Sequence, residues 1–152
     1  MKTLFSGMYD WFGTYLFYSK DMGDHLNGMD ITCSDFIGTP WYMIVGFIML
    51  IVTLFMYAIQ YHIYDNSRFN KKHHLWIMMF INMFLNFLVA TILASNSVKE
   101  GYCSELTLTT MDCIGFGISN AIWSFIFHFI ITSITVLRRL SNNCRNTTFW
   151  KP

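Results

Sequence analysis

Three long apolar runs account for most of the chain beyond residue 40. They cover residues 41–63, 75–95 and 113–137. Each exceeds the roughly 20 residues that a helix needs to cross a hydrocarbon core of about 30 Å. Buried helices of soluble proteins are seldom this long and this apolar three times in one short chain. The pattern therefore predicts three membrane-spanning helices.

Polar residues recur at helical spacing inside each of these runs. Residues three or four apart lie on one face of a helix, so the polar side chains form stripes. The stripes comprise Thr53, Tyr57 and Gln60 in the first run, Asn82 and Asn86 in the second, and Asn120, Ser124, His128 and Thr132 in the third. In lipid, a face of this kind marks contact between helices, because amides hydrogen-bond across the interface.

Two interpretations of the stripes compete. In one, the polar side chains only hold the helices together. In the other, several copies of the chain line a shared water-filled path or gate, with His128 as the best candidate because an imidazole changes charge between pH 5 and 8. Gly115, Gly117 and Ser119 would let helices approach closely. Because three or four short helices enclose little core, we expect a homo-oligomer that covers these polar faces.

The N-terminal segment, residues 4–19, is harder to assign. Asp10 interrupts its apolar run and no small-residue cleavage site follows, so it does not fit a signal peptide. It is either a fourth spanning helix or an aromatic-rich helix that lies in the interface. An Asp inside a membrane is tolerated mainly when it faces the bundle interior, and Ser6, Gly13 and Thr14 would lie on the same side. We expect four spanning helices, with three as the alternative.

Composition agrees with a membrane protein. Apolar residues make up 54% of the chain and charged residues 12%, about half of the 25% or so that is usual for soluble domains. We expect one all-α domain over residues 1–152, a polytopic helical bundle. Its outer loops would be 20–40 and 96–112, its inner loop 64–74 and its tail 138–152. The net charge of +1 argues against direct binding of nucleic acid.

Basic residues predict the orientation. Most of the Lys and Arg residues lie at the N-terminus, in the 64–74 loop or in the tail, and the positive-inside rule places the loop and the tail in the cytoplasm. With four spans the N-terminus is cytoplasmic as well, and with three it lies outside. The expected location is a bacterial inner membrane. The cations available to anionic membrane lipids or to a cytoplasmic protein partner are Arg68, Lys71, Lys72, Arg138, Arg139 and Arg145. The simpler interpretation is that they only set the topology.

Four cysteines divide between the two faces of the membrane. Cys33, Cys103 and Cys113 lie in or beside the outer loops, whereas Cys144 lies in the tail. Because the outer face is the oxidising one, the first three are the disulfide candidates, with three pairings open and one thiol left over. Neither a Cys-x-x-Cys nor a His-x-x-x-His pattern occurs, and we expect no metal and no other cofactor.

Several functional classes are disfavoured. No paired acids, metal site or activated nucleophile accompanies the apolar runs, so we do not expect an enzyme. Internal repeats with broken helices, which are typical of transporters, are not found. One remaining class is an oligomeric sensor or scaffold that couples an envelope event to a cytoplasmic partner. The other is a pore or channel that dissipates ion gradients, although no filter motif lies within a span.

In its topology the chain resembles a family of small bacterial membrane subunits. The resemblance is carried by four expected spans with both termini inside, short acidic outer loops and a basic cytoplasmic face. These features are similar to those of KwaA, the transmembrane subunit of the antiviral Kiwa system. The resemblance implies a homotetrameric sensor of phage attack that works with a cytoplasmic, DNA-binding effector subunit. It covers no diagnostic motif, so it assigns no role to any residue.

Overall fold

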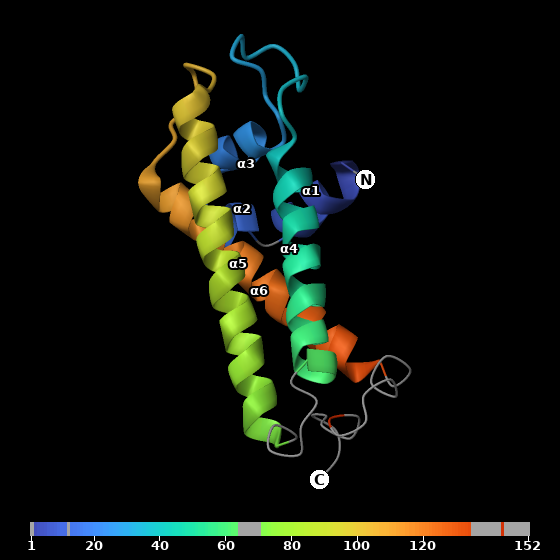
Figure 1. Cartoon of the computed structure of the whole chain (residues 1–152). Coiled ribbons are helices and arrows are strands. Elements are labelled where there is room, and N and C mark those ends of the chain that lie inside the picture. The colour runs from blue at the N-terminus through green and yellow to red at the C-terminus, as the bar shows by residue number, and fades with distance from the viewer. Residues whose placement is uncertain (1, 12, 64–70, 135–143, 145–152) are drawn as a thin grey trace.

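Every regular element in the described part of the computed structural model is a helix (Figure 1). The structure describes residues 2–11, 13–63, 71–134 and 144. In chain order the elements are α1 (Lys2–Asp10), α2 (Gly13–Leu16), α3 (Lys20–Leu26), α4 (Trp41–Ala58), the π-helical segment η1 (Ile59–Ile63), α5 (Lys72–Glu100) and α6 (Thr110–Ser133). Within these residues the predicted all-α class is confirmed.

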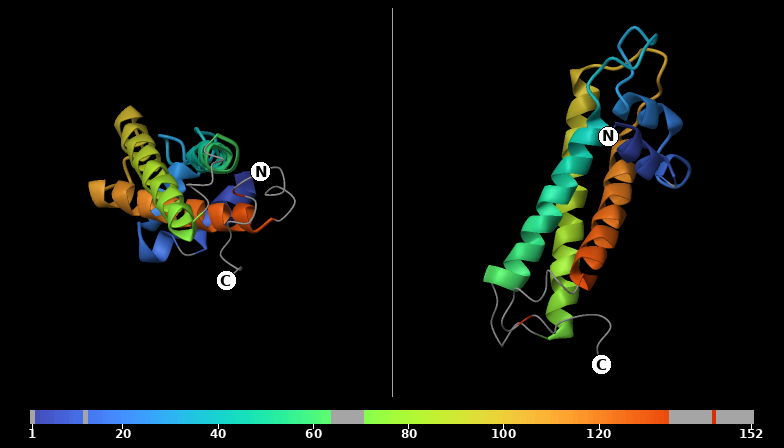
Figure 2. Two further views of the ribbon diagram at one scale, coloured as in Figure 1. Left: turned by 60° about the horizontal axis from the view of Figure 1, so that its bottom comes forward. Right: turned by 90° about the vertical axis from the view of Figure 1, so that its right-hand side faces the viewer.

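Three of these helices are long and apolar enough to cross a membrane. They are α4 continued by η1, with 23 residues, α5 with 29 and α6 with 24. Figure 1 and the right-hand view of Figure 2 show that α4 and α6 run in the same direction and that α5 runs antiparallel to both. The three predicted long helices are therefore confirmed, and their length and composition are those of the spans of an integral membrane protein.

The loop between α5 and α6, predicted as the second outer loop, is shorter than expected. Nothing between residues 96 and 100 breaks a helix, so α5 continues to Glu100 and ends where Gly101 takes a φ of 122°. The next helix begins early, because Thr109 and Asp112 form a reciprocal capping box that fixes the start of α6. The predicted loop 96–112 is reduced to residues 101–109.

The expected fourth spanning helix over residues 4–19 does not form. The segment is divided between α1, which has 9 residues, and α2, which has 4. At 1.5 Å per residue α1 is about 14 Å long, less than half of a hydrocarbon core. Gly7 and Gly13 weaken the helix by about 1 kcal/mol each relative to alanine, and Asp10 accepts a hydrogen bond from Tyr42 on α4. The described residues therefore have three helices long enough to span a membrane, which was the alternative to the expected four.

Glycines mark the places where the chain packs most closely. A Cβ at Gly46 of α4 would overlap the ring of Phe5, where α1 lies against that helix. A Cβ at Gly115 of α6 would overlap the backbone carbonyl of Phe17, and one at Gly117 would overlap the hydroxyl of Thr91 on α5. The expectation that Gly115 and Gly117 allow close approach is confirmed, although the partner of Gly115 is the N-terminal segment.

A cap closes one end of the bundle. We use this name for α3 together with residues 27–40 and 101–109, which lie around the start of α4 and the last turns of α5 (Figure 2). A disulfide between Cys33 and Cys103 joins the two loops across 70 residues of sequence. One of the three candidate pairings is thereby selected, and Cys113 is left as a free, buried thiol.

The outward faces of the long helices carry large apolar side chains. Phe55 of α4 is 61% exposed, and on α5 Phe84 and Ile92 are exposed to a similar extent. Acyl chains of a membrane would cover such faces without any specific partner. The polar side chains of the same helices point the other way, toward the interior of the bundle.

Candidate functional site: a buried polar core

The polar stripes of the three long helices meet inside a single chain. All nine stripe residues, from Thr53 to Thr132, are at most 5% exposed. We call this set the polar core. The sequence predicted that the stripes mark helix contacts, and the three helices do pack through them. A single chain therefore covers its own polar faces. The argument that a homo-oligomer is needed to cover them is wrong.

Asparagines connect the middle of the polar core. Asn82 of α5 donates from Nδ2 to the hydroxyl of Thr53 on α4 and to the backbone carbonyl of Ser124 on α6, both at 3.3 Å. Asn86, one turn along α5, donates to the side-chain and backbone oxygens of Asn82 at 3.0 Å. One amide at residue 82 therefore ties all three spanning helices together.

The network continues toward the cap end through Asn120 and a tyrosine. Asn120 of α6 donates from Nδ2 to the carbonyl of Asn86 at 3.0 Å. Its Oδ1 accepts a hydrogen bond of 2.6 Å from the hydroxyl of Tyr9 on α1. Tyr9 is fully buried and stacks on Tyr42, with ring centroids 5.2 Å apart. A helix outside the three-helix bundle is thus hydrogen-bonded into its interior.

Three tyrosines that sequence reasoning missed surround Asp10, the aspartate that it expected to face the bundle interior. The hydroxyl of Tyr42 donates to Asp10 Oδ1 at 3.0 Å. The hydroxyl of Tyr18 lies 3.0 Å from the hydroxyl of Tyr42 and donates to the backbone carbonyl of Tyr9 at 3.2 Å. Burial raises the pKa of Tyr9, Tyr18 and Asp10. The tyrosines therefore remain protonated and can only act as neutral hydrogen-bonding groups. The aromatic crowding of residues 4–19 was the available signal for this cluster.

Hydrogen bonding is incomplete at the end of the polar core that lies away from the cap. Ser124 and Thr132 donate to carbonyls of their own helix. Among the described residues, neither ring nitrogen of His128 and neither amide atom of Gln60 has a hydrogen-bond partner, although both side chains are buried. Gln60 lies in η1, and π-helical turns are frequent at functional sites. Buried polar groups without a partner are uncommon in folded proteins, and most of those in the polar core lie at this end, although Asn86 Oδ1 in its middle also lacks a partner among the described residues.

Helix geometry places the side chains of His128 and Gln60 at similar heights along the axis of the bundle. Asn82 brings Thr53 and Ser124 to one level. From that level His128 lies one turn farther, about 6 Å, and Gln60 two turns farther, about 10 Å, toward the same end.

The remaining predicted site residues lie elsewhere. Lys71 and Lys72 are exposed at the start of α5, at the end of the bundle opposite the cap. Arg68, Arg138, Arg139 and Arg145 fall outside the described residues. Among the described residues no three His, Cys, Asp or Glu side chains are placed to hold a metal ion.

Comparisons with protein-family models, with curated proteins and with solved structures found no match to this chain. Its function is therefore inferred from the arrangement of its own residues.

Proposed function

We propose that the chain is a membrane-embedded sensor or scaffold that couples an event at the cap end of the bundle to a cytoplasmic protein. The observation that carries this proposal is the hydrogen bond from Tyr9 to Asn120. Through it, α1 supplies a partner to an amide that is linked to all three spanning helices. Displacement of α1 would leave Asn120 Oδ1 unpaired in the interior, which costs about 1–3 kcal/mol.

The N-terminal helices are placed to receive such an event. Gly23 of α3 lies against Thr14 and Asp10, so α3 packs on the segment that holds Tyr9. The backbone N–H of Ser19, which precedes α3, donates to Asp112 of α6 at 2.7 Å. A molecule that pushes on the cap would therefore also move the residues that partner the polar core.

The proposed orientation puts the cap outside the cell and the basic 64–74 loop and tail in the cytoplasm of a bacterium. The positive-inside rule supports it, and so does the Cys33–Cys103 disulfide, because disulfides persist on the oxidising side of a membrane. With three spans, the N-terminus is then also outside. The resemblance to the Kiwa subunit, which would make the proposed partner an effector of an antiviral system, keeps the short acidic outer loops and the basic cytoplasmic face but loses the fourth span and the cytoplasmic N-terminus.

The test is the mass of the complex in nanodiscs after co-expression of the full chain with the products of neighbouring genes. We expect a complex that retains a cytosolic protein. Replacing Arg68, Lys71 and Lys72 together by Gln should release it. The matched control replaces Lys20 and Lys99, basic residues of the opposite end, and should retain the partner. A chain that retains no second protein contradicts the proposal.

A pore is the second candidate function. It is favoured by the unpartnered side chains of His128 and Gln60, because water or ions would satisfy them. In the same purification, a homo-oligomer without a cytosolic protein would point to this function, and ion flux into liposomes would then decide it. A monomer that conducts nothing would contradict both candidates, together with the predicted self-association.

A further inference from the structure

The N-terminal segment has an exposed apolar side, opposite the side that packs on α4 and α6. We call it the N-terminal face, and it consists of Leu4, Gly7, Trp11 and Leu16. The side chains of Leu4, Trp11 and Leu16 are 66%, 78% and 71% exposed. The first three members follow one another at helical spacing, and the backbone N–H of Trp11 donates to the carbonyl of Gly7 at 3.1 Å. They therefore lie on one side of α1.

This face lies alongside the spanning helices and not beyond their ends (Figure 1 and Figure 2). Phe5 of α1 packs on Gly46, which is about 8 Å along α4 from its first residue. The carbonyl of Phe17 lies against Gly115, at the same distance along α6. The 23 residues of α4 and η1 are about 34 Å long, and a hydrocarbon core is about 30 Å thick. Both contacts therefore fall inside the edge of the core.

The N-terminal face is continuous with surfaces that meet acyl chains. On one side, the ring of Phe5 contacts the ring of Phe47 on α4, with centroids 5.2 Å apart, and Phe47 is 39% exposed on the outward side of that helix. On the other side, the indole of Trp11 lies 6.4 Å from the indole of Trp123 on α6, measured between ring centroids. One apolar surface thus runs from α4 across α1 to α6.

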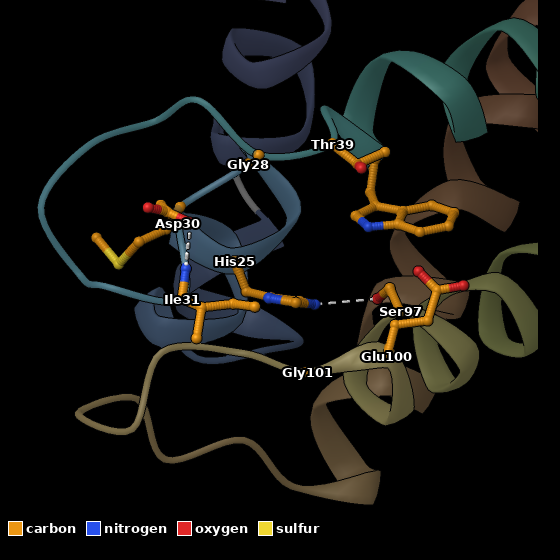
Figure 3. A pocket seen from close by; sticks show the side chains of 11 residues that line it. His25, Gly28, Asp30, Ile31, Thr39, Ser97, Glu100 and Gly101 are labelled. Atoms are coloured by element: carbon orange, nitrogen blue, oxygen red, sulfur yellow. Dashed lines mark hydrogen bonds between the residues drawn. The ribbon is translucent and has the colours of Figure 1, made fainter.

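Charged side chains begin where the segment ends. Residues 4–19 contain one charged residue, Asp10, whose carboxylate accepts a hydrogen bond from α4. Directly afterwards α3 begins with Lys20, and it lies nearer the cap end than α1 and α2 (Figure 2). Figure 3 shows two further acids of this end, Asp30 and Glu100, at a cavity in the cap. Because charges are costly among acyl chains, the edge of the core runs between α2 and α3.

We propose that the N-terminal face is embedded among the acyl chains of the leaflet on the cap side of the membrane. The buried side of α1 is bonded to the polar core, and its exposed side is covered by lipid. Helices at this level typically bury an apolar side about 5–10 Å deep, and tryptophan is enriched there. Lipid is favoured over a second copy of the chain because both flanks of the face continue into lipid-facing surface. The inference holds whether or not the chain relays a signal.

A nitroxide spin label on Trp11→Cys, in the full chain in nanodiscs, tests the proposal. Oxygen concentrates among acyl chains, whereas a water-soluble nickel chelate stays outside them, so collisions of the label with the two reagents report what surrounds it. The matched control is Ile37→Cys, because Ile37 is also 78% exposed but lies in the cap loop that carries Asp30. We expect the ratio of oxygen to nickel collisions to be at least tenfold higher for Trp11→Cys.

Two further sites keep the outcome clear. Leu16→Cys in α2 should behave like Trp11→Cys, which covers the case in which that variant fails to fold. Phe55→Cys, on the outward side of α4, gives the value of a site that faces acyl chains. The unchanged chain is the blank, since its thiols at Cys113 and Cys144 are buried.

Two results would overturn the proposal. If the labels at residues 11 and 16 give the ratio of Ile37→Cys, the face lies in water. If neither oxygen nor nickel reaches them, protein covers the face, and a second copy of the chain is then the occupant.

Discussion

The hydroxyl of Tyr9 joins a short helix to the interior of the bundle through one hydrogen bond. Tyr9→Phe keeps the buried ring but leaves Asn120 Oδ1 without its donor. We expect the free energy of unfolding to fall by about 1 kcal/mol, because hydrogen bonds in membrane proteins average about 0.6 kcal/mol and an unpaired buried acceptor costs more. Thermal unfolding in detergent measures the change.

The control for this substitution is Tyr102→Phe, which removes a hydroxyl from an exposed tyrosine of the cap. It should leave the unfolding temperature nearly unchanged. If both variants melt alike, the bond from α1 to α6 contributes nothing and the proposed coupling loses its support.

Individual residues also show which contacts could be predicted from the sequence and which could not. Helical spacing predicted the burial of Asn82, Asn86 and Asn120, because a polar stripe on an apolar helix has to face protein. It did not predict that Tyr9 would bond to Asn120, a residue 111 positions away, because no local pattern records such a contact. For the same reason, the cysteines were narrowed to three candidates but their pairing was left open.

At the scale of elements, Gly115 allows the N-terminal segment to cross α6. Gly115→Ala would place a methyl group on the backbone carbonyl of Phe17, which cannot move aside as a flexible side chain can. Overpacking of this kind costs about 1–3 kcal/mol, so we expect a lower unfolding temperature. Gly7→Ala in α1 is the control, because a Cβ there meets nothing within 4 Å and alanine favours the helix. Equal effects of the two substitutions would show that this crossing is loose.

The elements that were predicted well are those with a strong period. The three long helices follow from apolar runs and from stripes that both depend on helical spacing. The segment 4–19 has a weaker pattern, and its first helix, α1, is held against α4 by contacts of Asp10 with Tyr42 and of Phe5 with Gly46. Such contacts exist only after α4 has formed, so the sequence of the segment could not decide between its two interpretations.

For the whole molecule, the Cys33–Cys103 disulfide is the covalent link between the two loops of the cap. It closes a long loop, and the chain-entropy account assigns about 4 kcal/mol to a crosslink across 70 residues. We expect a reducing agent to lower the unfolding temperature of the unchanged chain. The double variant Cys33→Ser, Cys103→Ser should start at that lower temperature and not respond to the reductant. An unchanged chain that is equally insensitive would contradict a stabilising role.

The same disulfide reports the side of the membrane on which the cap lies. Cys103→Ser frees the thiol of Cys33, which is partly exposed in the cap. If the cap faces outward, a membrane-impermeant maleimide added to intact cells should label this variant and leave the unchanged chain unlabelled, since its remaining described thiols, Cys113 and Cys144, are buried. Labelling only after the cells are opened would place the cap inside. The basic loop would then face outward, against the positive-inside rule, and the proposed cytoplasmic partner would have no surface to bind.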